Sequence, residues 1–546
     1  MSNTRDPVGG AEQNIIAARV AKAEAIRARG ENPFANDLSP MPLSAIGDLR
    51  ARFDGARSPD GKYDAAKVAE IGAGQTLHVA GRVVAVRGFG KASFLRLRDR
   101  QGEIQLFCRA DTLGDTFARL DEIDVADIVE AEGQPMVTRA GELSLEPTSL
   151  RILTKALRPL PEKWHGLTDV ELRYRQRYVD LVANPEVKEA FAARSIIVRE
   201  LRRYLDAKEF VEVETPSMHT LIGGAAAKPF VTHHNTLDMR LYMRIAPELY
   251  LKRLVVGGFE RVYEVARCYR NEGISTRHNP EFTMLEAYMA YATYETWMDI
   301  AEDMLRTVDA CLAQALPEAH PKFAARRSFS LAEPFARVPM KDAVARGLQL
   351  AALPADVPAE IRKGTSQIKE WASRSPRAKK IDWSNFAKSM AKVESEGEAL
   401  FAAYEYLAEP FYSDDYRTSA GDKSVPVFTV DYPYEISPLS RRKDKDPSLV
   451  DRFELFAERI ELCNAFSELN DPVDQAARFR DQLEKRARGA EETMDYDEDY
   501  VRALEHGMPP AAGIGIGIDR LTMALTGITS IRDVILFPLL RPENSG

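Results

Sequence analysis

The sequence predicts an α+β protein that combines a small β-barrel near the N-terminus with a larger antiparallel sheet flanked by helices. Three observations support this prediction. Short strands joined by glycine-containing turns recur over 79–108, a hairpin rich in Val, Tyr and Phe spans 259–291, and a strand of alternating Gly and Ile runs over 513–518. Because a chain of 546 residues is too long for one ordinary domain, two or three domains are expected.

The N-terminal strands lie in a basic part of an acidic chain. The formal net charge is -9, yet seven basic residues and only two acidic ones lie between positions 82 and 109. Strands at 79–86, 93–97 and 103–108 with short turns between them are typical of a barrel of the OB type. Such a barrel binds unstacked bases by stacking and by hydrogen bonds to base edges, so this segment predicts a nucleic acid partner.

The predicted hairpin carries polar groups suited to a nucleotide. Alternate residues of a strand share a face, which places Arg270 and Glu272 on one face of the first strand. The second strand presents Phe282, Glu286 and Tyr288 on one face. A guanidinium binds phosphate or carboxylate with paired hydrogen bonds, an aromatic ring stacks on a purine, and carboxylates accept hydrogen bonds from amines. ATP with a cationic small molecule fits this arrangement, and the alternative is a solvated hairpin whose charges pair with each other.

The glycine-rich strand at 513–518 is expected to offer a flat surface. Its isoleucines pack into the core, so its glycines leave a face of bare backbone on which a flat ligand can lie. Arg520 follows at the expected start of a helix over 521–525, where a guanidinium and the helix N–H groups point at phosphate. A dinucleotide-binding turn is disfavoured because the third glycine comes too early and the segment does not open a βαβ unit.

These segments resemble the motifs of the class II aminoacyl-tRNA synthetases. The stretch 259–291, with Arg-Asn-Glu-Gly followed by Arg-His-Asn-Pro-Glu-Phe-Thr, resembles motif 2 in the form found in the bacterial lysyl-tRNA synthetases of subclass IIb. The stretch 513–521 resembles motif 3, whose arginine contacts the ATP phosphates, and 210–216 resembles motif 1, which lies at the dimer interface of the family. The resemblance implies an OB-fold barrel, a class II antiparallel-sheet catalytic domain flanked by helices, and a two-fold symmetric homodimer.

The resemblance also implies an activity. L-lysine would be activated by ATP to lysyl-adenylate and transferred to the 3′-terminal adenosine of tRNA(Lys), with no protein nucleophile. An aspartyl- or asparaginyl-type relative is an alternative that the carboxylates of the predicted amino acid pocket disfavour. A protein-lysylating enzyme is disfavoured by the intact barrel, and a catalytically dead paralogue by the presence together of Arg270, Glu272, Phe282 and Arg520.

The site residues follow from the same resemblance. The two catalytic residues are Arg270 and Arg520. The residues expected to bind ATP are Arg270, Glu272, His278, Asn279, Phe282, Glu454, Glu461, Gly515 and Arg520. Those expected to bind lysine are Gly224, Glu248, Arg270, Glu286, Tyr288, Asn464, Phe466 and Glu468. Glu454 and Glu461 are expected to hold Mg²⁺, which takes one or two carboxylates together with phosphate oxygens.

Charge supports lysine as the amino acid. Because lysine carries two ammonium groups, its pocket needs carboxylates, whereas an aspartate pocket would need Arg or Lys. Glu468 is expected to face the ε-ammonium group, and Gly224 and Glu248 the α-amino group. Glu461 has the opposite strand parity to Asn464, so both can serve one site only if a bulge or break lies between them. A surface helix over 451–461 is the alternative for the metal residues.

The barrel of the family holds the tRNA anticodon. By position, Phe94 is expected to stack on a base, and Arg87, Gln105 and Glu142 are expected to contact base edges. The alternative is that Phe94 belongs to the barrel core.

The expected domains follow from these assignments. They are a helical extension at 1–74, the anticodon-binding barrel at 75–155, a linker at 156–180 and the catalytic domain at 181–546. A helical insertion is expected at about 325–425, where the sequence resembles the family least.

Cysteine spacing and hydropathy disfavour other classes. The four cysteines are far apart and form no Cys-x-x-Cys pair, so neither a disulfide framework nor a zinc site is predicted. No segment has the apolar run of a membrane span, and positions 1–10 lack the apolar region of a signal peptide. A cytoplasmic enzyme with no membrane partner is therefore expected.

Overall fold

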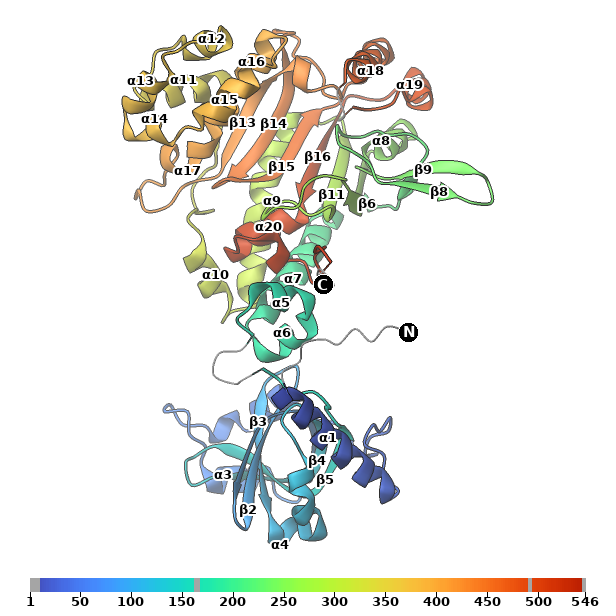
Figure 1. Ribbon diagram of the computed structural model, residues 1–546, viewed down its shortest axis with the longest axis vertical. Coiled ribbons are helices and arrows are strands. Elements are labelled where there is room, and N and C mark those ends of the chain that lie inside the picture. Colours follow the sequence, from blue (N-terminus) through green and yellow to red (C-terminus); the bar gives the residue numbers. More distant parts are fainter. Residues whose placement is uncertain (1–9, 162–166, 490–492, 543–546) are drawn as a thin grey trace. The chain divides into compact units, whose positions relative to one another are not determined.

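The computed structural model describes residues 10–161, 167–489 and 493–542 (Figure 1). The chain divides into two compact units, Met1–Thr168 and Asp169–Gly546. Residues 1–9, which were expected to lack a signal peptide, and residues 162–166 of the expected linker lie outside the described residues. Across the described ranges no helix is both long and apolar enough to cross a bilayer.

The first unit contains a closed barrel, as the sequence predicts. Its strands follow one another in the order β1-β2-β3-β5-β4. They are β1 (Leu77–Phe89), β2 (Ala92–Arg98), β3 (Glu103–Arg109), β4 (Ile128–Val137) and β5 (Leu143–Thr154). Alternation along β2 and β3 buries Leu95, Leu97, Ile104 and Leu106 inside the barrel and leaves the residues between them on its outer face.

The first unit also contains one long helix, α1, and several short helices. They are α1 (Gly10–Ala28), α2 (Ile46–Arg52), η1 (Asp54–Ala56), α3 (Ala65–Ile71), α4 (Ala110–Leu113) and η2 (Gly114–Glu122). Arg19 attaches α1 to the rest of the unit, because its guanidinium donates to the carbonyl oxygens of Val125 and Ala156.

The second unit is built on a sheet of eight strands in the order β12-β13-β14-β15-β16-β11-β10-β6. They are β6 (Val211–Glu212), β10 (Arg261–Tyr269), β11 (Glu281–Ala290), β12 (Ala336–Pro339), β13 (Val427–Pro433), β14 (Leu449–Ala457), β15 (Ile460–Ser467) and β16 (Ala511–Gly517). The central strands pair antiparallel, and only the edge strands β12 and β6 pair in parallel. This sheet confirms the predicted α+β class.

Three helices cover one face of the sheet. They are α7 (Val187–Asp206), α9 (Tyr294–Ala315) and α20 (Ile518–Thr526). Ile514 and Ile516 of β16 join their core, together with Leu201, Trp297 and Leu521. Because neighbouring residues of a strand alternate, the glycines of β16 face the opposite side of the sheet.

The segment between β12 and β13 folds into helices with a core of their own, which packs on β13 and β14 (Figure 1). These are α11 (Met340–Leu350), α12 (Val357–Arg362), α13 (Ile368–Ser373), α14 (Pro376–Lys380), α15 (Trp383–Met390), α16 (Glu396–Leu407), η3 (Glu409–Phe411) and α17 (Tyr412–Asp415).

The remaining elements surround the ends of the sheet. A small sheet in the order β7-β9-β8 consists of β7 (Met218–His219), β8 (Val231–His234) and β9 (Met239–Met243). The other helical elements are α5 (Val170–Arg175), α6 (Arg177–Ala183), α8 (Glu248–Val256), α10 (His320–Arg326), η4 (Tyr434–Ile436), α18 (Pro472–Ala487), α19 (Glu498–Glu505) and η5 (Ile531–Asp533). The four cysteines are free, and Cys108, Cys268 and Cys463 are buried.

Candidate active site

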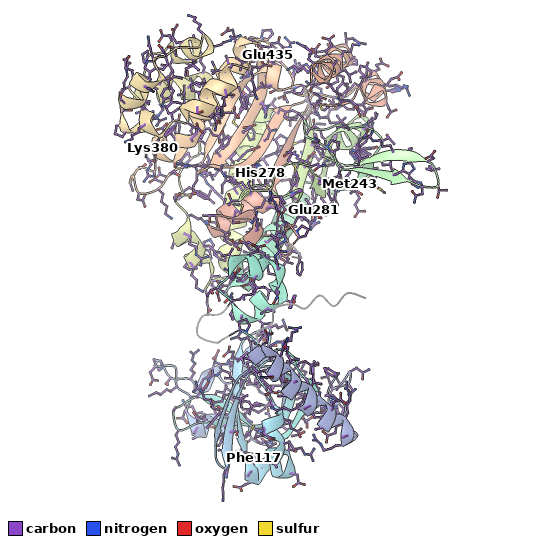
Figure 2. The ribbon with its side chains drawn as sticks, in the orientation of Figure 1. Phe117, Met243, His278, Glu281, Lys380 and Glu435 are labelled. Carbon is purple, nitrogen blue, oxygen red and sulfur yellow. The ribbon has the colours of Figure 1, made fainter. Side chains whose placement is uncertain are left out.

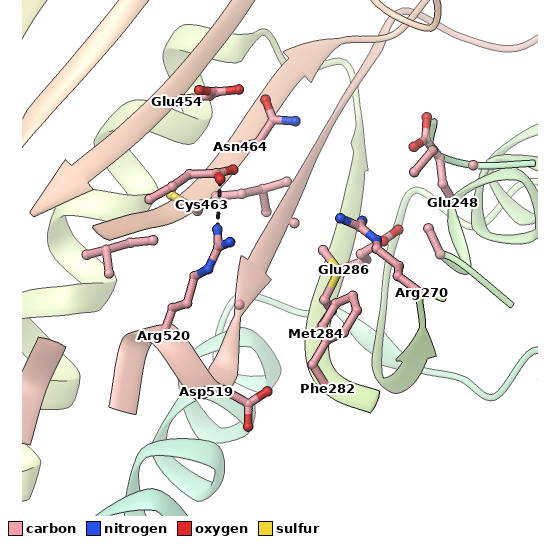
Figure 3. Close-up of a pocket in the computed structure, with 18 of the residues that line it drawn as sticks. Glu248, Arg270, Phe282, Met284, Glu286, Glu454, Cys463, Asn464, Asp519 and Arg520 are labelled. Atoms are coloured by element: carbon pink, nitrogen blue, oxygen red, sulfur yellow. Dashed lines mark hydrogen bonds and ion pairs between the residues drawn. The ribbon is translucent and has the colours of Figure 1, made fainter. Parts of the chain in front are cut away.

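A cavity of about 300 Å³ lies over the glycine face of β16. Every residue predicted to bind ATP or lysine lines it, except Glu468. Arg270 from the hairpin loop and Arg520 from α20 both reach into the cavity (Figure 3). The structure therefore gathers residues that are up to three hundred positions apart in the chain.

Cross-strand pairing places polar residues side by side on the cavity floor. Glu454 of β14 lies opposite Asn464 of β15, which in turn lies opposite Gly515 of β16. Gly515 lies opposite Glu286 of β11. The neighbouring row contains Arg452, Phe466, Gly513 and Tyr288. Because directly opposite residues share a face, four strands build one continuous surface.

A β-bulge brings Glu461 to this surface. The register of β14 with β15 shifts so that Glu461 pairs with Phe456, whereas Cys463 pairs with Leu455. Leu462 is the extra residue, and the bulge lets Glu461 line the cavity together with Asn464 despite their opposite parity. Because 449–457 is a strand, the alternative of a surface helix over 451–461 is wrong.

Two glycines of β16 lie close to side chains of the cavity. A Cβ atom at Gly513 would lie 2.4 Å from the Tyr288 ring and 2.6 Å from Oε1 of Glu468. A Cβ atom at Gly515 would lie 2.9 Å from the terminal methyl carbon of Met284. Atoms do not approach this closely without displacement. The end of the Met284 side chain can shift, whereas Tyr288 and Glu468 are buried, so the flat floor depends above all on Gly513.

Arg270 and Phe282 lie together at the hairpin. The Arg270 guanidinium is 5.1 Å from the centroid of the Phe282 ring, and its Nε atom is buried with no hydrogen-bond partner among the described residues. A ligand carboxylate or phosphate would satisfy that donor. Strand β10 ends at Tyr269, so Arg270 and Glu272 lie in the loop and not on the strand face that alternation predicts. Both still line the cavity.

Arg520 is the third residue of α20, whereas the sequence predicted that the helix begins after it. The strand ends at Gly517 and the helix begins at Ile518, so Arg520 lies in the first turn. Its Nη1 atom donates to Oε2 of Glu461 at 2.8 Å (Figure 3). Its Nη2 atom is 3.1 Å from Nε2 of His278, a residue of the hairpin loop that is labelled in Figure 2. Burial and then the nearby arginines lower the pKa of His278, so its neutral ring accepts from Arg520.

Glu454 and Glu461 provide carboxylate oxygens at the same end. Glu454 accepts from Nη2 of Arg452 at 2.5 Å and from the Tyr432 hydroxyl at 2.9 Å, and burial raises its pKa. No group of three or more His, Cys, Asp or Glu suited to a metal occurs in the part of the chain that the structure describes. Two carboxylates fit a Mg²⁺ ion that arrives with phosphate oxygens, since Mg²⁺ keeps several waters.

Three buried glutamates close the other end of the cavity. Glu248 and Glu286 line it, whereas Glu468 is not part of the lining, although its Oε1 lies 2.6 Å from where a Cβ atom of Gly513 would be. Burial, with a contribution from Glu248, raises the pKa of Glu286 to about 8, and burial also raises that of Glu468 to about 8. The Tyr288 hydroxyl donates to Glu286 at 3.1 Å. This end suits a cation.

Several residues of the site were not singled out from the sequence. Lys252 donates to Glu248 at 2.5 Å. Residues four positions apart on a helix are neighbours, so this spacing could have identified the pair from the sequence. Arg452, two residues before Glu454 on β14, donates to both Glu454 and Asn464. Asp519 accepts from Arg194 of α7 and from a backbone N–H of β11, and no sequence signal marks that role.

The residues predicted for the anticodon gather on the outer face of the barrel in the first unit. Arg87 of β1 lies opposite Phe94 of β2, which lies opposite Phe107 of β3. The rings of Phe94 and Phe107 stack with centroids 4.9 Å apart. Because Leu95 points into the barrel, Phe94 is on the outside, and the alternative that Phe94 belongs to the barrel core is wrong.

Gln105 and Glu142 lie beside these rings. Gln105 is opposite Arg96 on the same face and donates to Oγ of Ser144 at 3.2 Å. Glu142 accepts from Arg96 at 2.8 Å. Aromatic, cationic and amide groups therefore share one surface, which is the composition that single-stranded RNA requires.

Fold and site together define a class of protein. A family model described as tRNA synthetases class II (D, K and N) matches residues 169–541, and one described as an OB-fold nucleic acid binding domain matches residues 77–153. The first match covers more than half of the chain, so the chain belongs to the class II tRNA synthetases.

Relatives narrow this assignment. The chain is 50% identical over 542 residues to a lysine–tRNA ligase of Anaeromyxobacter dehalogenans (strain 2CP-C), covering 99% of this chain and 100% of the relative. It is 47% identical over 524 residues to one of Carboxydothermus hydrogenoformans, covering 94% and 100%, and 47% identical over 534 residues to one of Xanthomonas oryzae pv. oryzae, covering 97% of each. Within the class, the chain is a member of the lysine–tRNA ligase family.

Proposed function

We propose that this protein activates L-lysine with ATP to lysyl-adenylate and transfers lysine to the 3′-terminal adenosine of tRNA(Lys). The observation that carries the choice of amino acid is the meeting of Glu248, Glu286 and Glu468 at one end of the cavity. Buried carboxylates favour a ligand that brings cations, whereas an aspartyl- or asparaginyl-type pocket would place a cation or an amide there.

The reaction needs positioning and charge stabilisation but no protein nucleophile. A lysine carboxylate oxygen attacks the α-phosphorus of ATP, and the bond to pyrophosphate breaks. A ribose hydroxyl of the terminal adenosine then attacks the lysyl carbonyl carbon, and AMP leaves. Arg270 would orient the carboxylate and α-phosphate, Phe282 would stack on adenine, and Arg520 would bind the outer phosphates with His278.

The nucleotide is expected to bring Mg²⁺. Glu454 and Glu461 would hold the ion together with phosphate oxygens, and the ion would neutralise charge on the phosphates. Arg520 pairs with Glu461, so both groups would contact the Mg²⁺-nucleotide while lying next to each other. Glu272, Asn279 and Gly515 complete the proposed ATP site.

The amino acid would lie across β16 with its two ammonium groups at the glutamates. Glu248 and Gly224 are suited to the α-amino group, because Gly224 has φ +86 and its loop lies against Ala246 and Glu248. The remaining residues proposed for the side chain are Glu286, Tyr288, Asn464, Phe466 and Glu468. Oε1 of Glu468 is buried with no hydrogen-bond donor among the described residues, whereas Oε2 forms an ion pair with Lys252, so Oε1 is the oxygen available to accept from an ε-ammonium group.

The barrel would read the anticodon of tRNA(Lys). Phe94 and Phe107 offer stacking surfaces, and Arg87, Gln105 and Glu142 offer groups for base edges. The basic strands supply the charge that RNA binding needs in a chain whose net charge is negative.

A homodimer is part of the proposal. Strand β6, in the segment that resembles motif 1, forms one edge of the large sheet, and Val211 on it is 48% exposed. Met218, Val231 and Leu237 of the adjacent small sheet and its hairpin are more than half exposed. An edge strand with exposed apolar neighbours is the kind of surface that a second copy covers. We place the enzyme in the cytoplasm.

ATP–pyrophosphate exchange across the twenty amino acids tests the activity. Exchange should depend on lysine and on Mg²⁺. Exchange with another amino acid would contradict the assignment of lysine as the substrate. The absence of exchange in a folded protein would favour a catalytically dead paralogue. Lysine transfer to a protein but not to tRNA(Lys) would favour the protein-lysylating alternative.

A further inference from the structure

Lys252 is a buried cation behind the amino acid end of the cavity. It lies on α8, its side chain is buried, and it does not line the cavity. Its ammonium donates to Oε1 of Glu248 at 2.5 Å, forms a close ion pair with Glu468, and lies 5.1 Å from the centroid of the Phe466 ring. All three neighbours belong to the proposed lysine site, so Lys252 contacts that site from the protein side.

Burial of a lysine is unfavourable unless its charge is matched. Burial lowers the pKa of Lys252, but Glu248 and Glu468 raise it further, and the net result is a raised value. The ammonium therefore stays charged. Since Glu248 is on the same helix and Glu468 follows the end of β15, this one cation connects two elements that close the pocket.

The charges at this end give a simple count. Glu248, Glu286 and Glu468 carry three negative charges when ionised, and Lys252 and Arg270 carry two positive ones. Arg452 also lines the cavity, but its charge is offset by its ion pair with Glu454. The net charge of the counted groups is therefore -1 when all three glutamates are ionised. Lysine with two ammonium groups and one carboxylate carries one net positive charge, so the occupied site is balanced.

We infer that Lys252 is a positioning residue that holds Glu248 and Glu468 in place and sets the charge of the pocket to match a ligand with one net positive charge. The inference rests on the proposed lysine site. It predicts that a pocket without this ammonium prefers a ligand with a higher positive charge.

Lys252→Met tests this, because it keeps an unbranched side chain and removes the charge. In ATP–pyrophosphate exchange the KM for lysine should rise at least about 30-fold, while the KM for ATP should change less than about 3-fold. Arg253→Met is the matched control. Arg253 is the next residue on α8 and is also ion-paired, but with Asp497 and outside the cavity. Its loss should leave both KM values close to those of the wild type.

Cadaverine distinguishes a charge role from a packing role. It is lysine without the carboxylate and therefore carries two positive charges at pH 7. As a competitive inhibitor of exchange, it should be weak for the wild type. The ratio of its inhibition constant to the lysine KM should fall at least about tenfold in Lys252→Met, whereas a loss of packing would weaken both ligands equally.

The double variant Lys252→Met/Glu468→Gln has the same net pocket charge as the wild type. It tests the role of Lys252 even if the single variant Lys252→Met does not fold. Its lysine KM should be at least about tenfold lower than the product of the two single effects predicts, or it should fold where Lys252→Met does not. Independent effects of the two changes, or an unchanged cadaverine ratio, would overturn the role of Lys252. If Glu468→Gln alone does not alter the lysine KM, the proposed pocket is wrong.

Discussion

At the scale of single residues, burial controls the charge of the amino acid end. The pKa values of Glu286 and Glu468 are both raised to about 8, chiefly because burial disfavours the ionised carboxylate. The positive charge of Lys252 lowers the pKa of Glu468 and so offsets part of the effect of burial. A ligand that brings ammonium groups favours the ionised forms, so lysine binding and the protonation of the pocket are linked.

Glu468→Gln should weaken lysine binding selectively. The change removes the proposed partner of the ε-ammonium group, and a hydrogen bond to a charged group is worth about 1.5–3 kcal/mol, so the lysine KM should rise about 10- to 100-fold. The ATP KM should change by less than about threefold, as measured by exchange kinetics. Equal effects on both substrates would show that the pocket is misplaced.

Glu264→Gln is a matched control for that change. Glu264 is also buried and lies opposite Glu286, but it is paired with Arg244 and does not line the cavity. Its replacement should lower the free energy of unfolding and leave the ratio of the two KM values unchanged.

Lysine binding should release protons near neutral pH. Because the pKa of Glu286 is raised to about 8, this carboxyl is mostly protonated at pH 7 before lysine binds. It faces Glu248, Tyr288, Lys252 and Arg270. An ammonium group favours the carboxylate, so affinity for lysine should increase from about pH 6.5 to 8.5. Calorimetric titrations in buffers of different ionisation enthalpy give the number of protons released. Glu286→Gln should release fewer, and a wild type that releases none would contradict the prediction.

The same shift has the opposite consequence for folding. A carboxyl whose pKa is raised in the folded protein contributes stability that is fully present below its ordinary value of 4.5. That contribution is lost as the pH rises towards about 8. Without lysine, the protein should therefore become less stable between about pH 4.5 and 8, a range that only partly overlaps the one in which lysine binding becomes stronger.

At the scale of elements, alternation explains how much of the site could be predicted. It correctly placed Phe282, Glu286 and Tyr288 on one face of β11, and the isoleucines of β16 in the core. It failed at Arg270 because the strand ends one residue earlier. The spacing of four could have paired Lys252 with Glu248, but its contact with Glu468 could not be predicted, because it joins residues more than two hundred positions apart.

Gly513→Ala should damage the pocket. The added Cβ atom would overlap the Tyr288 ring and Glu468, which lie 2.4 Å and 2.6 Å from it. Overpacking of this kind costs about 1–3 kcal/mol of stability, and displacement of Glu468 should raise the lysine KM. Denaturant unfolding and exchange kinetics measure the two effects.

Gly517→Ala tests whether steric overlap is the cause. It lies on the same face of β16, but the nearest atoms to its Cβ would be those of the Arg520 side chain, 3.7 Å away or more. This variant should lose less than about 1 kcal/mol of stability. A loss as large as that of Gly513→Ala would mean that strand propensity, and not contact with the pocket, explains both.

At the scale of the whole molecule, each unit has a core of its own and a separate chemical role. The barrel core is formed by residues of the first unit, and the helices α7, α9 and α20 form the core of the second with the sheet. The sequence indicated both units because barrel strands and motif strands have strong local patterns. It did not indicate how the insertion folds, because its helices are short and are fixed by a shared core whose members are spread over 340–456, Trp371 and Trp383 among them.

Val211→Lys should weaken the proposed homodimer. Val211 lies on edge strand β6 and is 48% exposed, and a lysine on an edge strand opposes pairing with a second copy. Sedimentation velocity should show a shift from dimer to monomer at micromolar concentration, together with lower aminoacylation activity. Leu350→Lys is the control, because Leu350 is similarly exposed on α11 of the insertion, away from that edge. A dimer that persists in Val211→Lys, or one that is lost equally in Leu350→Lys, would place the interface on another surface.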